Sequence, residues 1–302
     1  MTKRPRIILA VLLLIVCGPV KGFSQKAAPM PWALLPRVTA LDESRKNELL
    51  NFLKTESNYG QCKGSMLQCL SGEKPDKTAV RFANFGAHLV SKGVPAQSLG
   101  ILAKERAKLI YEPAAQAFTY ANSPFLGNEN AKITLVDFAE FKCTYCVALS
   151  PVLKKLVAES SGRVRLVFKH FPLKNHPGTF FSSKAAQAAH GQGKFWAMYD
   201  LLYANFNKQG MEDVLEYARV LGMDMERYKT DLEDPKVEEL IERDKMEGVR
   251  AKVTGTPTLF INGKMYVLRH DEDFLKDLIN EEAERLGLEP PYRDWVYIRQ
   301  KR

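Results

Sequence analysis

Apolar residues recur at helical spacing through the first third of the chain. Over 37–112 no alternating or continuous apolar stretch interrupts this spacing. Asp42 is a residue type that caps helices, and Leu49, Leu50 and Leu53 follow it as an apolar stripe. We therefore expect a small all-helical domain at 37–112. Its expected helices are 42–56, a shorter one after Gly64, 77–90 and 95–110.

The middle of the chain has a different pattern. Ile133–Phe138 is an almost unbroken apolar run, short enough and β-branched enough to be a strand buried on both faces. Apolar positions at helical spacing follow in 147–157, and 163–170 then alternates apolar and basic side chains. If the helix is a crossover, the two strands are parallel and form a βαβ unit.

The pattern turns helical again over about 177–252 and then changes back to strands. Asn262-Gly263 separates two short apolar segments, 258–261 and 264–268, and this dipeptide favours a type I′ hairpin turn. A helix from Asp271 to about Arg285 follows. The remaining segments are a connector at 113–130, which packs its aromatic residues, and a tail at 287–302, which packs onto the body through Tyr292, Trp295 and Tyr297.

Cys143 and Cys146 lie where the buried strand gives way to the helix. Unbonded backbone N–H groups at a helix start stabilise an anion, so the first thiol of such a pair can have a pKa well below about 8.5. Cys143 would then attack and the shielded Cys146 would resolve. The alternatives are a static disulfide and a zinc site. Zinc would need two more ligands at matching spacing, and the chain has no second C-x-x-C.

The N-terminus has the pattern of a secretory signal. Three basic residues precede the apolar run Ile7–Val16, which is too short to span a bilayer. Small residues place the cleavage site near Ser24, so we expect a signal peptide at 1–24, a linker rich in Ala and Pro at 25–36, and a periplasmic or otherwise exported protein. Val16 before Cys17 argues against lipid attachment; lipid or membrane anchoring through 1–24 is the alternative.

Charge and cysteine count change once residues 1–24 are set aside. This segment holds four basic and no acidic residues, so its removal lowers the formal net charge from +9 to +5. Residues 25–112 carry this +5, without the basic and aromatic interleaving of a nucleic-acid site, and we expect no nucleic acid as a partner. Four cysteines remain, an even number that suits an oxidising compartment.

Cys62 and Cys69 are the second cysteine pair. On one continuous helix their Cα atoms would lie about 10.5 Å apart, too far for a disulfide. Gly60 and Gly64 can bend the backbone, so a loop-to-helix disulfide is our preferred interpretation. An auxiliary redox pair that exchanges with Cys143 is the alternative.

Two motifs together resemble the thioredoxin superfamily, and most closely its periplasmic DsbA-like branch. They are VDFAEFKCTYC at Val136–Cys146, with Pro151 eight residues after Cys143, and GTPTLFING at Gly255–Gly263. The resemblance covers about 125–286. It implies an α/β thioredoxin-like fold over 131–286, with a helical insertion at about 177–252 and the all-helical domain in front of it.

The resemblance also implies roles for single residues. Pro257 matches the cis-proline beside the active-site cysteines, which docks substrate together with the backbone of Thr256. Asp137 matches the buried acid that assists proton transfer to or from Cys146; a carboxylate inside an apolar strand also flags a site, unless the position is exposed. Thr144-Tyr145 departs from the DsbA pattern, because no histidine lies between the cysteines.

We therefore expect an exported thiol-disulfide oxidoreductase that acts on protein substrates with cysteines, and disulfide formation is our preferred direction. Isomerisation or reduction, a chaperone-like binding module, and a redox partner of one client are the alternatives. The expected partners include a membrane or soluble redox protein and a second copy of the chain through 37–112. No cofactor is expected. The histidines show no metal spacing, and we expect surface or loop positions for them. These are His88, His170, His176, His190 and His270.

Overall fold

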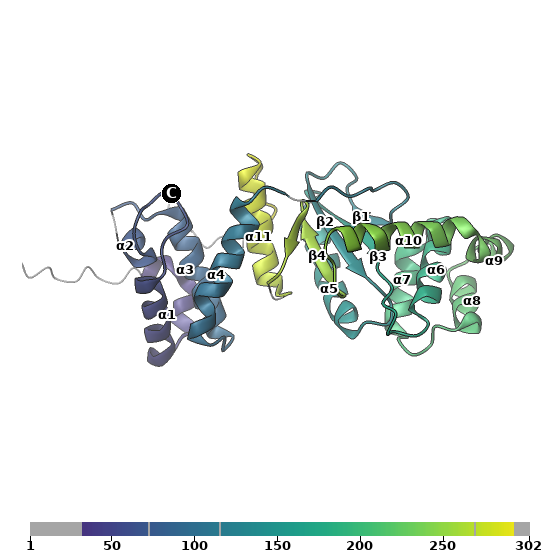
Figure 1. Ribbon diagram of the computed structural model, residues 1–302, viewed down its shortest axis with the longest axis horizontal. Helices are drawn as coiled ribbons and strands as arrows, with labels where there is room; N and C mark the ends of the chain where they lie inside the picture. Colours follow the sequence, from purple (N-terminus) through teal and green to yellow (C-terminus); the bar gives the residue numbers. More distant parts are fainter. Residues whose placement is uncertain (1–31, 72, 115, 269, 293–302) are drawn as a thin grey trace, which may run out of the picture.

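The computed structural model describes residues 32–71, 73–114, 116–268 and 270–292. The predicted signal peptide with Cys17 therefore lies outside the described residues, as do Trp295 and Tyr297 of the tail. No helix of the described part is both long and apolar enough to cross a membrane. The described chain is elongated, with the N-terminal helices at one end and helices α8 (Met211–Val220) and α9 (Met225–Glu233) at the other (Figure 1).

The N-terminal part is helical, as its apolar spacing predicts. Its helices are α1 (Glu43–Thr55), α2 (Met66–Leu70), α3 (Lys77–Ser91) and α4 (Ala96–Tyr111). Asp42, Ser65 and Asp76 each cap a helix by accepting a backbone N–H through the side chain.

The predicted linker at 25–36 is wrong for its last five residues. These residues form the 3₁₀ helix η1 (Trp32–Leu34) and the start of a second, η2 (Pro36–Ala40). Leu35 and Val38 are buried in the helical core, so this segment packs like the elements that follow it. Pro36 occupies the start of η2, where its missing N–H costs nothing.

A mixed sheet of five strands carries the second half. Its strands, in sequence, are β1 (Phe125–Gly127), β2 (Ile133–Ala139), β3 (Val164–His170), β4 (Thr258–Ile261) and β5 (Lys264–Tyr266). Their order across the sheet is β1-β3-β2-β4-β5. The predicted pairing of β2 and β3 is confirmed as parallel, and every other pair is antiparallel. Asn262 and Gly263 both have positive φ in the β4–β5 turn, as a type I′ turn requires.

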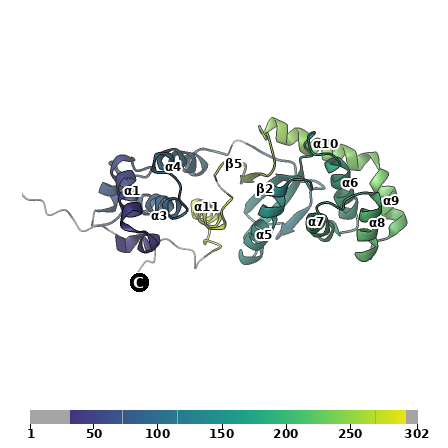
Figure 2. The ribbon, with the colours of Figure 1, turned by 90° about the horizontal axis from the view of Figure 1, so that it is seen from below.

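Helices cover both faces of this sheet (Figures 1 and 2). On one face lie α5 (Thr144–Glu159) and α11 (Glu272–Arg285), and on the other lies α10 (Pro235–Arg250). β2 is buried along its whole length, because Leu135 and Asp137 face α5 while Val136 and Phe138 face the opposite side.

The predicted connector at 113–130 contains an unpredicted strand. β1 pairs with β3 at the sheet edge, and its three residues are too few to show a period. Phe118 packs on Phe138 and Phe260, whereas Phe125 is 40% exposed, so only part of the predicted aromatic packing occurs.

The helical insertion between β3 and α10 extends beyond the sheet (Figure 1). It consists of α6 (Thr179–His190), α7 (Phe195–Ala204), α8 (Met211–Val220) and α9 (Met225–Glu233). Phe195, Tyr199 and Tyr203 turn one side of α7 towards the segment that carries Cys143 and Cys146, and all join one apolar cluster.

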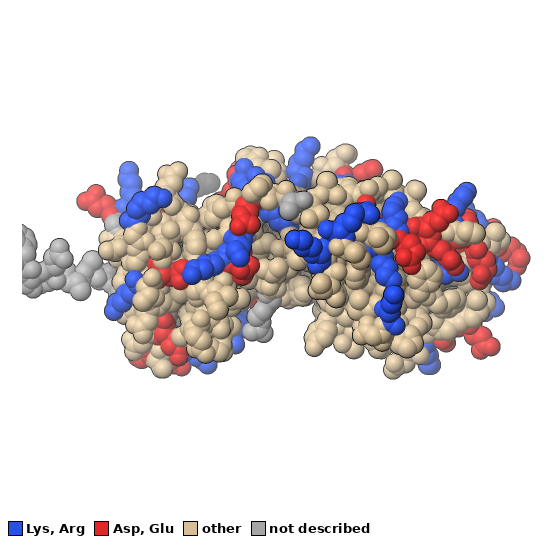
Figure 3. Space-filling view, in the orientation of Figure 1, with Lys and Arg blue, Asp and Glu red and all other residues tan. Residues whose placement is uncertain are grey.

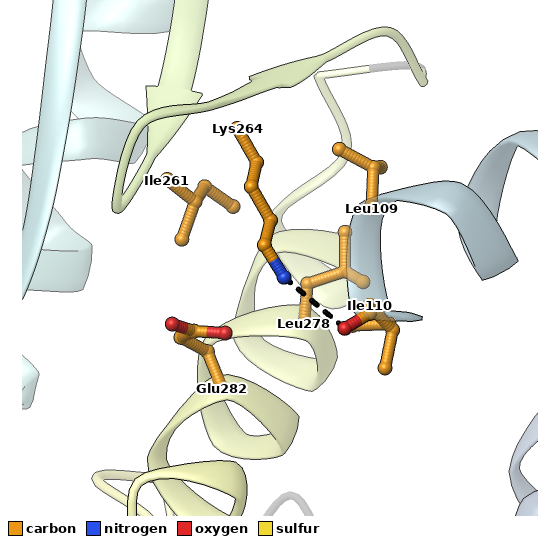
Figure 4. Close-up of a pocket in the computed structure, with 6 residues that line it drawn as sticks. All are labelled: Leu109, Ile110, Ile261, Lys264, Leu278 and Glu282. Carbon is orange, nitrogen blue, oxygen red and sulfur yellow. Dashed lines mark hydrogen bonds between the residues drawn. The ribbon is translucent and has the colours of Figure 1, made fainter. Parts of the chain in front are cut away.

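α11 lies between the N-terminal helices and the sheet, so the two halves share one continuous core (Figures 1 and 2). Arg106 of α4 is fully buried and contacts Asp277 at 2.6 Å and Glu281 at 2.7 Å, both on α11. Nearby, Lys264 Nζ donates to the carbonyl oxygen of Ile110 at 3.1 Å (Figure 4).

The start of the C-terminal tail packs onto the body as predicted. Tyr292 is buried, and its hydroxyl donates to the carbonyl oxygen of Leu156 in α5 at 2.8 Å. Its backbone N–H also donates to Asn280 of α11. The tail therefore holds α5 and α11 together where the described residues end.

Candidate active site

Cys143 and Cys146 occupy the start of α5, directly after the buried strand β2. Cys143 is the N-cap residue, and its carbonyl oxygen accepts from the N–H groups of Cys146 and Val147 at 3.1 and 3.2 Å. Both cysteines are free thiols with 4% and 2% of their surface exposed. The N–H groups of Tyr145 and Cys146, in the first turn of the helix, also face the Cys143 sulfur.

The pKa values of the two thiols are shifted in opposite directions. The pKa of Cys143 is lowered to about 6, chiefly because the Cys146 thiol donates a hydrogen bond to its sulfur; the backbone N–H groups of Tyr145 and Cys146 add to this effect. Burial raises the pKa of Cys146 far above its ordinary value, and donation to Cys143 raises it further. One sulfur is a ready thiolate and the other holds its proton.

Asp137 lies beneath the cysteines on β2. Its carboxyl is buried, and no described residue donates a hydrogen bond to Oδ1, so the alternative of an exposed strand position is wrong. Burial raises the pKa of Asp137 to about 7, and the negative charge of Cys143 adds to the shift. The carboxyl can therefore gain or lose a proton near neutral pH.

The fold brings Thr256 and Pro257 to this pair across 113 residues of sequence. The Thr256–Pro257 peptide bond is cis, and Cys143 Sγ lies 3.3 Å from the carbonyl oxygen of Thr256. β4 begins at Thr258, which pairs with Phe138 of β2, so the register of the sheet positions the loop beside the cysteines.

Glu140 is a residue that the sequence analysis missed. It follows β2 and is fully buried, yet three donors reach its carboxylate. Lys142 N–H donates to Oε2 at 2.9 Å, the Thr179 hydroxyl donates to the same oxygen, and His176 Nδ1 lies 2.5 Å from Oε1. The only signal in the sequence is an acidic residue between Ala139 and Phe141, three positions before Cys143.

Cys62 and Cys69 form a disulfide in the N-terminal helical part, away from α5. Cys62 lies in the loop before α2 and Cys69 in α2, with Cα atoms 5.9 Å apart. Asp76 Oδ2 accepts from the Cys62 N–H, and the Asp76 N–H donates to the carbonyl oxygen of Cys69. The N-terminal helices and α11 separate this pair from α5 (Figure 1).

The expectation of surface or loop histidines is wrong for His88 and His170. Both are buried within regular elements, His88 in α3 and His170 at the end of β3. Folding also brings His88 close to Asp271 and Asp273, a trio that the spacing could not reveal. Arg37 contacts His88 and donates to Asp273, so a guanidinium supplies positive charge there.

Comparison with known proteins identifies the family. A family model described as Thioredoxin matches residues 119–281, more than half of the chain. The chain belongs to the DsbA-like thioredoxin family. The match excludes α1–α4, so the helical part in front of the DsbA-like domain lies outside it.

Individual relatives of the DsbA-like domain differ in length. The Na(+)/H(+) antiporter NhaA 3 of Salinispora tropica is 36% identical over 141 residues, which cover 46% of this chain and 22% of the antiporter. The probable disulfide bond formation protein D of Bacillus cereus is 28% identical over 183 residues, covering 56% of this chain and 83% of that protein. The chain thus spans only 22–23% of the length of the antiporters that it matches.

A solved structure covers the same domain. The thioredoxin-like oxidoreductase from Silicibacter pomeroyi is 28% identical and superposes with a TM-score of 0.50, covering 59% of this chain and 98% of that chain. The likeness supports the fold of the DsbA-like domain, including its helical insertion.

Proposed function

We propose that this protein is an exported thiol-disulfide oxidoreductase that exchanges disulfides with protein substrates through Cys143 and Cys146. The observation that supports this proposal most directly is the difference in pKa between the two thiols. Cys143, at a helix start, has its pKa lowered to about 6, whereas burial raises the pKa of Cys146 beside it. A low-pKa thiol is a good attacking and leaving group in disulfide exchange.

In the forming direction, a substrate thiolate attacks Cys143 Sγ of the Cys143–Cys146 disulfide. The bond between the two sulfurs breaks, and Cys146 leaves as a thiolate that takes a proton from Asp137. The substrate's second thiolate then attacks the substrate sulfur of the mixed disulfide, and Cys143 leaves as a thiolate. The substrate is oxidised and the pair is reduced, so an external redox partner must reoxidise it.

Thr256 and Pro257 are proposed to hold the substrate during exchange. The carbonyl of Thr256 borders Cys143, and β4 starts directly after Pro257, so the loop has backbone groups suited to an extended peptide. Tyr145 is 75% exposed between the cysteines and offers an apolar surface beside them.

Export is part of this proposal. The Cys62–Cys69 disulfide suits an oxidising compartment. Basic and acidic side chains are mixed over the N-terminal helices, without a continuous basic patch on the face shown in Figure 3. The proposed partners are exported proteins with cysteines and a second copy of the chain bound through α1–α4; nucleic acid is not among them.

The equilibrium constant of the reduced pair with glutathione tests the direction. A reduction potential near about −120 mV is expected for disulfide formation, whereas a value near about −270 mV would make the protein a reductant. Cys143→Ser should abolish both oxidative refolding of a reduced protein and insulin reduction. The binding module would be supported instead if the unsubstituted protein exchanged no disulfides and Cys143→Ser still prevented the aggregation of unfolded proteins.

A further inference from the structure

Glu140 carries a buried carboxylate in the loop that directly precedes Cys143. Burying a carboxylate is unfavourable unless hydrogen bonds compensate for the lost water. Here Lys142 N–H, the Thr179 hydroxyl and His176 Nδ1 surround the two oxygens. Two of these three partners come from the start of the helical insertion, so the carboxylate joins the loop to α6.

The backbone of Glu140 also makes contacts that fix its position. Its carbonyl oxygen accepts from the Tyr203 hydroxyl of α7 at 3.3 Å. Its N–H group faces the Cys146 sulfur, where a donor favours the thiolate. Glu140 therefore contacts the insertion through its side chain and carbonyl while its amide faces a reacting sulfur.

The next two loop residues are tied to the insertion as well. Gln209 donates to the carbonyl oxygen of Phe141 at 3.1 Å, and Lys142 Nζ donates to that of Phe206 at 3.0 Å. The Lys142 N–H is fixed by Glu140 itself, which closes a tight turn directly before Cys143. The position of the α5 N-cap thus depends on this loop.

We propose that Glu140 is a positioning residue that, with His176 and Thr179, fastens the active-site loop to the helical insertion and keeps Cys143 and Cys146 aimed for exchange. The proposal rests on the proposed function of the two cysteines. Glu140 touches no substrate in this role, because it acts through the backbone before Cys143 and through the N–H group that faces Cys146.

Three substitutions test the role. Glu140→Ala removes the acceptor of the Lys142 N–H and should raise the pKa of Cys143. At a pH below the parent's pKa, the variant should have about tenfold less Cys143 thiolate than the parent. His176→Ala should act in the same direction. In Glu140→Gln the thiolate fraction of Cys143 should stay within about threefold of the parent's. The amide oxygen can accept from Lys142 and Thr179, and the amide NH₂ can donate to Nδ1 of a neutral His176 that carries its proton on Nε2.

The thiolate is followed by its ultraviolet absorbance, and the glutathione equilibrium constant and urea unfolding are measured in parallel. Asp244→Asn is the matched control, because it disrupts a buried ion pair with Lys169 at 2.8 Å on another face of the sheet. The control should lose stability with an unchanged thiolate titration and equilibrium constant.

Each outcome decides between the roles. If Glu140→Ala and His176→Ala lower stability like Asp244→Asn but leave the Cys143 titration and the equilibrium constant unchanged, the contacts are structural and the proposal is wrong. If Glu140→Ala raises the pKa of Cys143 while the parent exchanges no disulfide with protein substrates, the positioning role stands and the proposed function fails.

Discussion

Asp137 and Glu140 are buried carboxylates three positions apart, and their hydrogen bonds give them different roles. The Oδ1 atom of Asp137 receives no hydrogen bond from the described residues, and burial raises the pKa of this acid to about 7. Glu140 is surrounded by donors from Lys142, Thr179 and His176. An acid without compensating donors is suited to move a proton, whereas a fully bonded acid is suited to hold a loop.

Asp137→Asn should increase the stability of the reduced protein above neutral pH. The folded pKa of about 7 exceeds the ordinary 3.8, so the folded state retains a proton that the unfolded state has lost. Stability therefore falls as the pH rises from about 4 to about 7, by up to about 4 kcal/mol in total. Asparagine carries no proton to lose, so the gain should grow across this interval and level off above it.

Urea unfolding of both reduced proteins at several pH values measures this gain. The rate at which Cys146 resolves a mixed disulfide should also lose its inflection near pH 7 in Asp137→Asn. A gain that is the same at pH 4 and pH 8 would contradict the assigned titration of Asp137.

At the scale of elements, the loop before α2 depends on a cap that belongs to α3. Asp76 caps α3 through the Ala79 N–H, and it also accepts from Asn58 and from the N–H of Cys62. One carboxylate therefore positions both the helix and the disulfide loop. The disulfide itself closes a short loop and belongs to the N-terminal core rather than to the catalytic site.

Replacing both Cys62 and Cys69 by alanine should lower the free energy of unfolding by about 2 to 3 kcal/mol, because the unfolded chain loses a short covalent loop. The glutathione equilibrium constant of the Cys143 pair should remain unchanged, since α4 and α11 lie between α2, which carries Cys69, and α5 (Figure 1). A shift of that constant would instead support the auxiliary redox role.

At the scale of the whole molecule, α11 unites the two halves. The sequence predicts that this helix closes the C-terminal domain, but its acidic side faces Arg106 and Arg81 of the N-terminal helices. Lys264 of β5 and Ile110 of α4 meet at the same junction, above Leu278 of α11 (Figure 4). The N-terminal helices are therefore packed against the DsbA-like domain rather than joined to it only by a linker.

Arg106→Met should lower the free energy of unfolding by about 3 to 5 kcal/mol, because the buried Asp277 and Glu281 would lose their closest cation and keep Arg81, at 3.5 and 3.7 Å. Burial already raises the pKa of Glu281, so the loss should be greater at pH 8 than at pH 5. Arg45→Met, which affects an exposed contact 3.8 Å from Asp42, should cost less than about 1 kcal/mol. Equal losses in the two variants would contradict a buried junction.

The elements of this fold follow largely from local sequence. The cap at Asp42, the helix that starts near Asp271, the apolar run of β2 and the Asn262-Gly263 turn were predicted and occur, because each depends on neighbouring residues. β1 and the packed segment 32–36 were not predicted, since three strand residues have no measurable period and burial of Leu35 depends on distant helices.

By itself the sequence determined the cysteine pair and its place between strand and helix, because a C-x-x-C at a helix start is a local feature. Only the tertiary structure decided that His176 reaches Glu140 and that Arg106 reaches α11. His176 and Glu140 are 36 positions apart in the sequence, and Arg106 and Asp277 are 171 positions apart. Their partners are selected by the packing of whole helices, which no spacing along the chain records.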